Sequence, residues 1–175
     1  MEGDTSRQGP HPFGPLDKPG SGGGLHRPEG GSAFVYIAPM PTPATHLAIS
    51  PRLVGEPLDL GPGRASAALT LLPEMAADAL DLVHGGFVFG LADYAAMLAV
   101  NHPLVVLGSS SVRFLAPARV GERLVAEARV VEETGARKRR VQVEVRRGEQ
   151  TVLSGEFLAF IPDRHVLTGK DKEPA

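Results

Sequence analysis

The sequence predicts an α+β domain in which an antiparallel sheet wraps around one long helix. Residues 87–101 are rich in Ala, Leu and Met, are apolar on nearly every side and are followed by Pro103, which is typical of a buried helix. The segments 124–130 and 141–145 alternate apolar and polar residues, as strands do when one face lies in a core. One helix is too little to cover both faces of a parallel sheet, so we expect antiparallel strands.

Two strands are expected before this helix and four after it. Residues 54–60 and 64–72 form the first pair, and Pro73 closes the second of them. The four later strands are expected at 105–115, 124–130, 141–145 and 152–161, with turns at Gly121-Glu122, Thr134-Gly135 and Gly148-Glu149.

The composition argues against several classes of protein. The chain has 175 residues, a size typical of one domain, and its net charge of −2 gives no basic face for nucleic acid. The absence of cysteine excludes a disulfide framework, a thiolate nucleophile and a Cys-ligated zinc site. The histidines lack metal-ligand spacing, and no phosphate-binding, dinucleotide-binding or GxSxG motif occurs. We therefore expect no metal site and no bound cofactor.

We expect one folded domain with a disordered segment on each side of it. Residues 1–45 hold 9 of the 21 glycines and 8 of the 16 prolines, which predicts a disordered extension and leaves open a short latch at 34–37. The folded domain is expected at 46–168 and a disordered tail at 169–175. The start lacks the features of a signal peptide, and the apolar stretch 87–100 is too short to span a bilayer. We therefore expect a cytoplasmic protein without membrane contact.

Asp93 is the only charged residue between Phe87 and Val100. An ionised carboxylate is costly to bury, so it needs a partner, a raised pKa or access to a water-filled cleft. Helical spacing surrounds Asp93 with Phe89, Gly90 and Met97, which do not form a polar stripe. A catalytic role and a place on a solvent-exposed side of the helix both remain open at this point.

His84-Gly85-Gly86 precedes the predicted helix. Two glycines allow a sharp turn and a close approach of a ligand, and the first N–H groups of a helix have no partner within it. Such N–H groups stabilise a developing oxyanion. An ordinary turn between a loop and a helix is the alternative interpretation.

Gly85 and Asp93 are eight residues apart, which is ~12 Å along a helix that rises ~1.5 Å per residue. A base or nucleophile must come within about 3 Å of its target. The two features therefore cannot act on one carbonyl within a subunit. Across a two-fold axis they can, so the spacing predicts a homodimer.

The segment from His84 to Asp93, HGGFVFGLAD, resembles the HGG-x5-AD motif of the phenylacetic-acid-degradation type of hotdog-fold acyl-CoA thioesterases. The segment VRFLAPARVGE, from Val112 to Glu122, resembles the strand and turn after the central helix of that family. The resemblance covers residues from about 50 to about 162. It implies the hotdog fold, homodimers with a continuous sheet, pairing of dimers into tetramers, and hydrolysis of acyl-CoA to free acid and CoA.

The resemblance also implies roles for individual residues. Asp93 matches the catalytic carboxylate, which acts as general base or nucleophile, and Gly85 matches the backbone N–H that polarises the thioester carbonyl. His84 matches the histidine that positions this turn. Asp78 stands where the family often has an Asn that orients substrate or water. An ionised Asp cannot donate a hydrogen bond, so this orienting role stays open.

Substrate contacts are expected at the same turn and on the next strand. The family often has Ser or Thr on that strand, although at least two of the three consecutive serines there fit simple strand hydroxyls. Arg113, Arg119 and the run 137–140 are candidates for the CoA phosphates, with solvated side chains as the alternative. The expected substrate-binding residues are Gly86, Phe87, Ser109, Ser110, Ser111 and Arg113.

Two other functions remain on the same fold. The strands from Arg113 to Gly155 also resemble the effector domain of a fatty-acid-synthesis repressor, which predicts a non-catalytic sensor of acyl-CoA or acyl-carrier protein. The Gly/Pro-rich first 45 residues are unsuited to a helix-turn-helix, which counts against a DNA-binding regulator. A dehydratase or hydratase needs a His and an acid on the same substrate carbons. The acyl group, the choice between dimer and tetramer, and the attacking group are not determined by the sequence.

Overall fold

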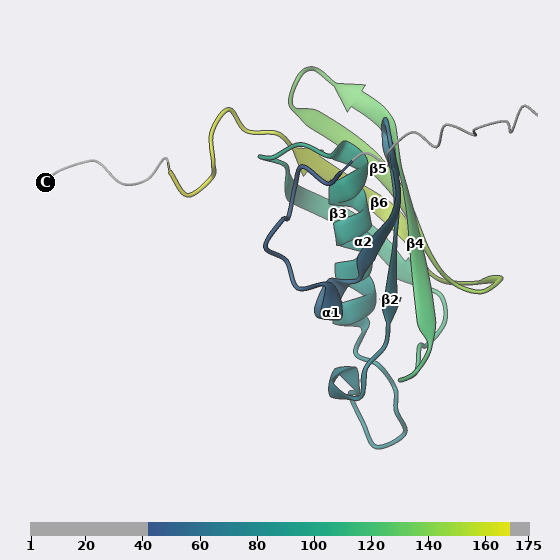
Figure 1. The fold of residues 1–175 in the computed structure, drawn as a ribbon. Coiled ribbons are helices and arrows are strands. Elements are labelled where there is room, and N and C mark those ends of the chain that lie inside the picture. The colour runs from purple at the N-terminus through teal and green to yellow at the C-terminus, as the bar shows by residue number, and fades with distance from the viewer. Residues whose placement is uncertain (1–41, 169–175) are drawn as a thin grey trace, which may run out of the picture. The chain divides into compact units, whose positions relative to one another are not determined.

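The computed structural model describes residues 42–168, which form a six-stranded antiparallel sheet packed against one long helix (Figure 1). The strand order is β1-β2-β4-β5-β6-β3. This is the predicted α+β arrangement, and the fold class is confirmed. Most of the extension expected at 1–45, the latch at 34–37 and the tail at 169–175 lie outside the described residues.

The strands lie close to their predicted positions. The helix, α2, spans Gly85–Val100, and the strands are β1 (Glu56–Gly61), β2 (Arg64–Thr70), β3 (Val106–Phe114), β4 (Arg123–Thr134), β5 (Lys138–Arg147) and β6 (Gln150–Phe160). Two short elements were not expected: α1 (Pro51–Val54) and the 3-10 turn η1 (Pro73–Met75). Both are too short to show a helical period in the sequence, and Val54 was assigned to β1 because it is apolar.

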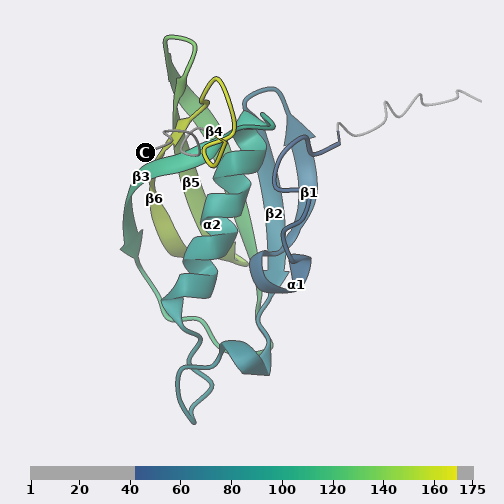
Figure 2. The ribbon, with the colours of Figure 1, turned by 90° about the vertical axis from the view of Figure 1, so that its left-hand side faces the viewer.

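Helix α2 begins and ends where local chemistry dictates. The His84 side chain accepts a hydrogen bond from the backbone N–H of Gly86 at the N-terminus, and Asn101 ends the helix in the left-handed conformation with φ 47°. Its sheet-facing side chains are fully buried against β2, β4 and β5, and Figure 2 shows the helix lying across that face of the sheet. Leu91 and Leu98 of α2 are completely buried. Burying one leucine side chain removes enough apolar surface from water to stabilise the fold by ~2 kcal/mol.

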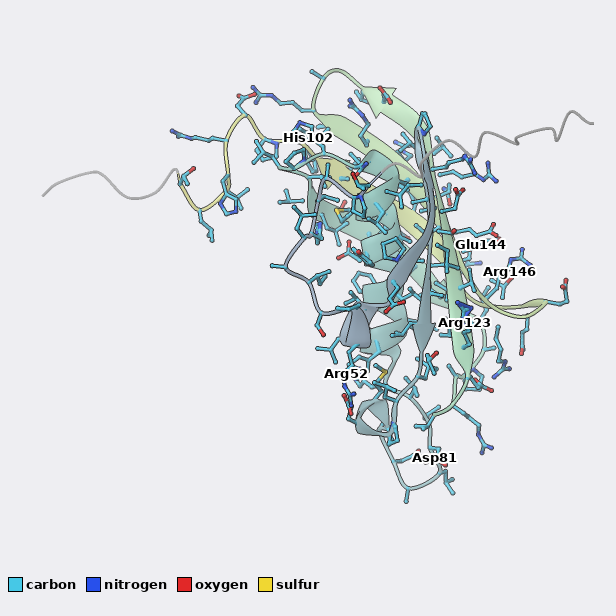
Figure 3. The ribbon with its side chains drawn as sticks, in the orientation of Figure 1. Arg52, Asp81, His102, Arg123, Glu144 and Arg146 are labelled. Carbon is cyan, nitrogen blue, oxygen red and sulfur yellow. The ribbon has the colours of Figure 1, made fainter. Side chains whose placement is uncertain are left out.

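The predicted alternation of β4 and β5 is confirmed. Val141, Val143 and Val145 are buried under α2, whereas Gln142 and Glu144 between them are exposed. Figure 3 shows Glu144 and Arg146 projecting from the side of the sheet that faces away from the helix. The sheet therefore has one apolar face and one charged face.

Strand β3 lies at an edge of the sheet and pairs only with β6 within residues 42–168. Its central residues, from Gly108 to Ser111, are all exposed. The register shifts between Leu107 and Ser109. This bulge decides which of the following side chains face the helix, because residues opposite each other in an antiparallel pair lie on the same face.

The segment before α1 is anchored to the C-terminal end of α2. The Ala44 N–H donates to Asn101 Oδ1 at 2.7 Å, Thr45 is buried, and the His46 ring lies 6.3 Å from the Tyr94 ring. The contacts of Ala44 and Thr45 precede His46, where the sequence analysis placed the start of the domain. No helix within the described part of the chain has the length and apolarity needed to cross a bilayer.

We expect Leu98→Ala to lower the free energy of unfolding by about 2–5 kcal/mol, because the Leu98 side chain in α2 is completely buried and its loss leaves a cavity. Leu47→Ala is the matched control, since Leu47 is 78% exposed, and should change this free energy by less than about 0.5 kcal/mol. Urea denaturation followed by circular dichroism measures both. Equal effects of the two substitutions would contradict the core described here.

Candidate functional site

Asp93 lies on the side of α2 that stays partly exposed to solvent. The helix residues that stay at least partly exposed around it are Gly86, Phe89 and Gly90, which share one face at helical spacing. We call these four residues the open stripe of α2. The side chains on the opposite side, such as Leu91, point into the core. Asp93 therefore stands among the α2 residues that are not fully buried.

The Asp93 carboxylate lacks a hydrogen-bond partner. Its Oδ1 atom is buried and finds no donor among the described residues. Burial disfavours the charged form and raises the pKa of Asp93 from 3.8 to about 6. A carboxylate with this pKa is mostly ionised at neutral pH and is a stronger base than an ordinary Asp, which suits general-base or nucleophilic chemistry.

The N-terminus of α2 leaves one N–H group free. His84 Nδ1 accepts from the Gly86 N–H at 2.9 Å, and the His84 carbonyl accepts from the Phe87 N–H at 3.1 Å. Among residues 42–168 the Gly85 N–H has no acceptor. Because Nδ1 accepts, it carries no proton in this arrangement, so His84 acts here as a cap that holds the turn.

An apolar hollow of about 280 Å³ lies beside Gly85. Its lining consists of Gly85, Val83, Val88 and the segment 114–118. A Cβ atom at Gly85 would come within 3.0 Å of Phe114 Cε1. The half-exposed Phe114 ring therefore lies against the glycine at the start of the helix. Sequence reasoning missed Phe114, because its side is set by the bulge in β3.

The two features do not meet within a protomer. Gly85 and Asp93 are both in α2, and eight residues of a straight helix separate them by ~12 Å. The geometry predicted from spacing therefore holds in the structure. One protomer supplies an acid and an N–H donor that are too far apart to act on one carbonyl.

The register of β3 separates the three candidate serines. Ser110 is opposite Phe157, a buried residue whose ring contacts the Phe89 ring at 5.5 Å, so Ser110 lies on the helix-facing side. Ser109 and Ser111 lie on the other side. Arg113 is opposite Ser154 on that charged face and is not brought toward Gly85 or Asp93.

Asp78 is engaged in its own loop rather than at the helix. Its Oδ1 accepts from the N–H groups of Leu80 at 2.9 Å and Leu82 at 3.2 Å, and its side chain is exposed. Figure 3 places the neighbouring Asp81 on this same loop, beyond the N-terminal end of α2. Phe87 is half-buried, and its ring packs edge-on against the His84 ring at 6.4 Å. The structure gives Asp78 a turn-stabilising contact.

Residues 42–168 contain no group of three or more His, Asp or Glu side chains that could hold a metal ion.

Comparison with known proteins identifies the family of this chain. Residues 80–154 match the family model described as the thioesterase superfamily. The crystal structure of the uncharacterized protein PH1136 from Pyrococcus horikoshii is 48% identical with a TM-score of 0.72, and the match covers 73% of this chain and 98% of that one. The chain belongs to the thioesterase superfamily. A mutant of the phenylacetic acid degradation protein PaaI from Thermus thermophilus is a further structural relative of this superfamily member, with 30% identity over 63% of this chain and 95% of that one and a TM-score of 0.58.

Curated relatives match this superfamily member over only part of their own length. A protein named methylthioribose-1-phosphate isomerase from Aquifex aeolicus (strain VF5) is 49% identical over 65% of this chain, but the match is 25% of that protein. The transcription factor FapR from Caldanaerobacter subterraneus is 28% identical over 66% of this chain and 58% of its own length. The matched quarter of the Aquifex protein carries no inference about isomerase activity here.

Asp93→Asn should stabilise the protein relative to wild type at high pH. The folded-state pKa of Asp93 is raised, so the wild-type fold loses stability as pH rises through about 6. We expect the variant's advantage to grow by about 1–3 kcal/mol between pH 4.5 and pH 8. Urea denaturation at both pH values measures it, with Glu149→Gln on an exposed hairpin as the control. A variant whose advantage is the same at both pH values would show that Asp93 is not buried as described.

Proposed function

We propose that the protein hydrolyses acyl-CoA thioesters in a homodimer, with Asp93 of one protomer and the Gly85 N–H of the partner subunit acting on the same carbonyl. The observation that carries the proposal is Asp93 itself, a buried carboxylate oxygen without a partner in the open stripe of α2. The free N–H at the start of the same helix supplies the complementary donor. Their separation along α2 requires a second copy of the chain to bring them together.

The reaction follows from these two groups. The thioester carbonyl oxygen accepts a hydrogen bond from the Gly85 N–H, which stabilises the negative charge that develops on it. Asp93 takes a proton from water while the water oxygen bonds to the carbonyl carbon. The carbon–sulfur bond then breaks, the proton passes to the departing thiolate, and the free acid and CoA leave. Direct attack by the Asp93 carboxylate, followed by hydrolysis of the anhydride, is the other route with the same balance.

Two features of the fold support the homodimer. The first is the open stripe of α2, whose residues stay at least partly exposed in one protomer. Strand β3 has one unpaired edge and exposed central residues, and such an edge accepts a strand from a second chain. A dimer joined along β3 would extend the sheet. The stripe residues of the two helices would then lie close to the shared axis.

An acyl-thioester sensor is the second candidate, supported by the similarity to FapR over most of the folded region. In that case the same site would bind a thioester without hydrolysing it. A thermal shift with acyl-CoA and no release of free thiol would favour the sensor. Turnover of enoyl or 3-hydroxyacyl thioesters without thiol release would favour a dehydratase or hydratase.

Gly85→Pro should abolish hydrolysis while Gly85→Ala retains most of it. Proline is tolerated at the first position of a helix, and the extended conformation of His84, with φ −61° and ψ 127°, is suited to a following proline. The proline removes the N–H, and the loss should lower kcat by about 10²–10³. The alanine keeps the N–H and introduces the same Cβ beside Phe114. Thiol release measures both, and equal activities would refute the role of the N–H group.

Subunit mixing tests whether the site is shared. Asp93→Asn and Gly85→Pro are each expected to be nearly inactive as homodimers. Refolded or coexpressed together, they form mixed dimers in which one of two sites has an intact Asp93 and an intact Gly85 from opposite chains. We expect activity to return in the mixture. If none returns while size-exclusion chromatography with differently tagged chains shows mixed dimers, the shared site is wrong.

The pH profile reports the Asp93 pKa. Because the ionised carboxylate is the active form and its pKa is about 6, kcat/KM should be constant at higher pH. Below this pKa it should fall by about tenfold per pH unit. The profile is measured with a thiol reagent that works across this range or by direct product analysis. A profile that is flat down to about pH 4.5 would contradict Asp93 as the base.

A further inference from the structure

Two segments run side by side at the N-terminal end of α2. Residues 76–83 and 114–120 are joined by hydrogen bonds from the Val83 N–H to the Ala118 carbonyl at 2.9 Å and from the Val120 N–H to the Asp81 carbonyl at 3.0 Å. Figures 1 and 2 show residues 76–83 as the loop that projects beyond this end of the helix. We call the surface of these two paired segments the ledge. It extends from the start of α2, at Gly85, away from the helix.

Two hollows follow each other along this ledge. The first is the cavity beside Gly85, and the second has a volume of about 440 Å³ and is lined by Asp78, Leu80, Leu82, Pro117, Arg119 and Arg147. Pro117 lines both. We call the two together the Pro117 groove. It leads from the free N–H of Gly85 to a pair of arginines.

The lining of the groove is apolar except for Asp78, Arg119 and Arg147 at its far end, where Asp78 accepts hydrogen bonds from the Leu80 and Leu82 N–H groups. Leu80 is 73% exposed, and Phe114 and Leu115 are each 55% exposed. Large side chains left in water next to one another mark a surface that binds something. The groove is therefore suited to a long, thin and largely apolar group.

Only one of the two arginines is free. Arg147 Nη1 donates to both carboxylate oxygens of Glu122 at 2.6 and 2.7 Å, and Arg147 Nη2 donates to Gln150. Burial opposes ionisation of Glu122, but these bonds outweigh it and hold the pKa of Glu122 below its ordinary value. The Arg119 backbone N–H also donates to Glu122 at 2.9 Å, whereas the Arg119 guanidinium forms no hydrogen bond or ion pair with any residue in 42–168. The Glu122–Arg147 pair thus holds the backbone of Arg119 and leaves its charge available.

The other basic candidates are engaged or point elsewhere. Arg137 pairs with Asp163, Arg139 with Glu133, and Arg140 with Glu132 and Glu156, while Lys138 lies over the Phe160 ring. Arg113 lies on the charged face of the sheet. Among the basic residues considered from the sequence, Arg119 alone lines the groove that reaches Gly85 with a guanidinium that has no partner in residues 42–168.

We propose that the Pro117 groove binds the phosphopantetheine arm of the thioester and that Arg119 binds its phosphate. The inference rests on the proposed function, because it places the thioester carbonyl at Gly85. The arm is a thin chain with a thioester at one end, two amides and a gem-dimethyl group along it, and a phosphate at the other end. The groove presents the matching order of a free N–H, apolar walls and a guanidinium. Coenzyme A and acyl-carrier protein both carry this arm.

Two substrates that differ only in the phosphate test Arg119. Arg119→Gln should raise KM for an acyl-phosphopantetheine by about 10-fold to 100-fold, the effect of losing a hydrogen bond to a charged group. It should leave KM for the corresponding acyl-pantetheine, and kcat for both, within about twofold. Arg129→Gln, at an exposed arginine of β4, is the control and should change neither. Equal effects of Arg119→Gln on the two substrates would overturn the phosphate contact.

Binding measurements separate this inference from the proposed function. Isothermal titration calorimetry of the full chain with CoA and with pantetheine needs no turnover. We expect Arg119→Gln to weaken CoA binding about 10-fold or more and to change pantetheine binding by less than about twofold. If CoA binding depends on Arg119 but no thioester is hydrolysed, the groove stands and the enzymatic function fails. If thioesters are hydrolysed while CoA binding and KM ignore Arg119, the groove assignment fails alone.

The same variant distinguishes the two carriers. Kinetics with one acyl group attached to CoA and to holo-acyl-carrier protein identify the preferred source by kcat/KM. The Arg119→Gln defect should appear with the preferred source. A wild-type protein whose kcat/KM for acyl-pantetheine equals that for both carriers would contradict any use of the phosphate.

Discussion

The sheet can cover only one side of α2, and the rest of the structure depends on this. The helix is apolar on nearly all its faces, yet strands β2, β4 and β5 bury just the side that carries residues such as Leu91 and Leu98. The open stripe stays partly exposed and carries small and aromatic residues around a single carboxylate. A surface of this kind costs free energy in a lone protomer, because apolar groups remain partly in water and Asp93 Oδ1 finds no donor in residues 42–168. Covering it with a second helix would stabilise the assembly and at the same time build the proposed site.

The start of α2 shows how a small local interaction selects a chemical group. A helix begins with several N–H groups that have no internal acceptor, and without a cap they would be equivalent donors. The His84 side chain and carbonyl take up the N–H groups of Gly86 and Phe87. Among the described residues, what remains is the N–H of Gly85, a residue that lines the apolar hollow beside Phe114. The second glycine is needed because a side chain at that position would collide with the capping His84 ring.

Membership of the thioesterase superfamily assigns the chain to a family without assigning it a reaction. The superfamily assignment rests on residues 80–154 and on a close structural relative, neither of which identifies a reaction for this chain. The similarity to FapR shows that related sequences also occur in a transcription factor. The distinction between hydrolysis and sensing therefore depends on what Asp93 does to a bound carbonyl. Under the proposed function, the raised pKa of that carboxyl makes it a stronger base than an ordinary Asp.

The amino-acid sequence by itself determined the long helix, the strands with their alternating faces, and the presence of an acid and a glycine turn too far apart to act together. These features depend on the order of neighbours along the chain, which a period or a spacing detects. The tertiary structure alone decided that Ser110 faces the helix while Ser109 and Ser111 do not, because the bulge after Leu107 shifts the register. It also decided that Asp78 is occupied by its own loop and that Phe114 lies against Gly85. Glu122 engages Arg147, and the Arg119 guanidinium has no partner in the part of the chain that the structure describes. Some of these contacts join residues that are distant in sequence, and others depend on the register between two strands. A local sequence pattern cannot predict either kind.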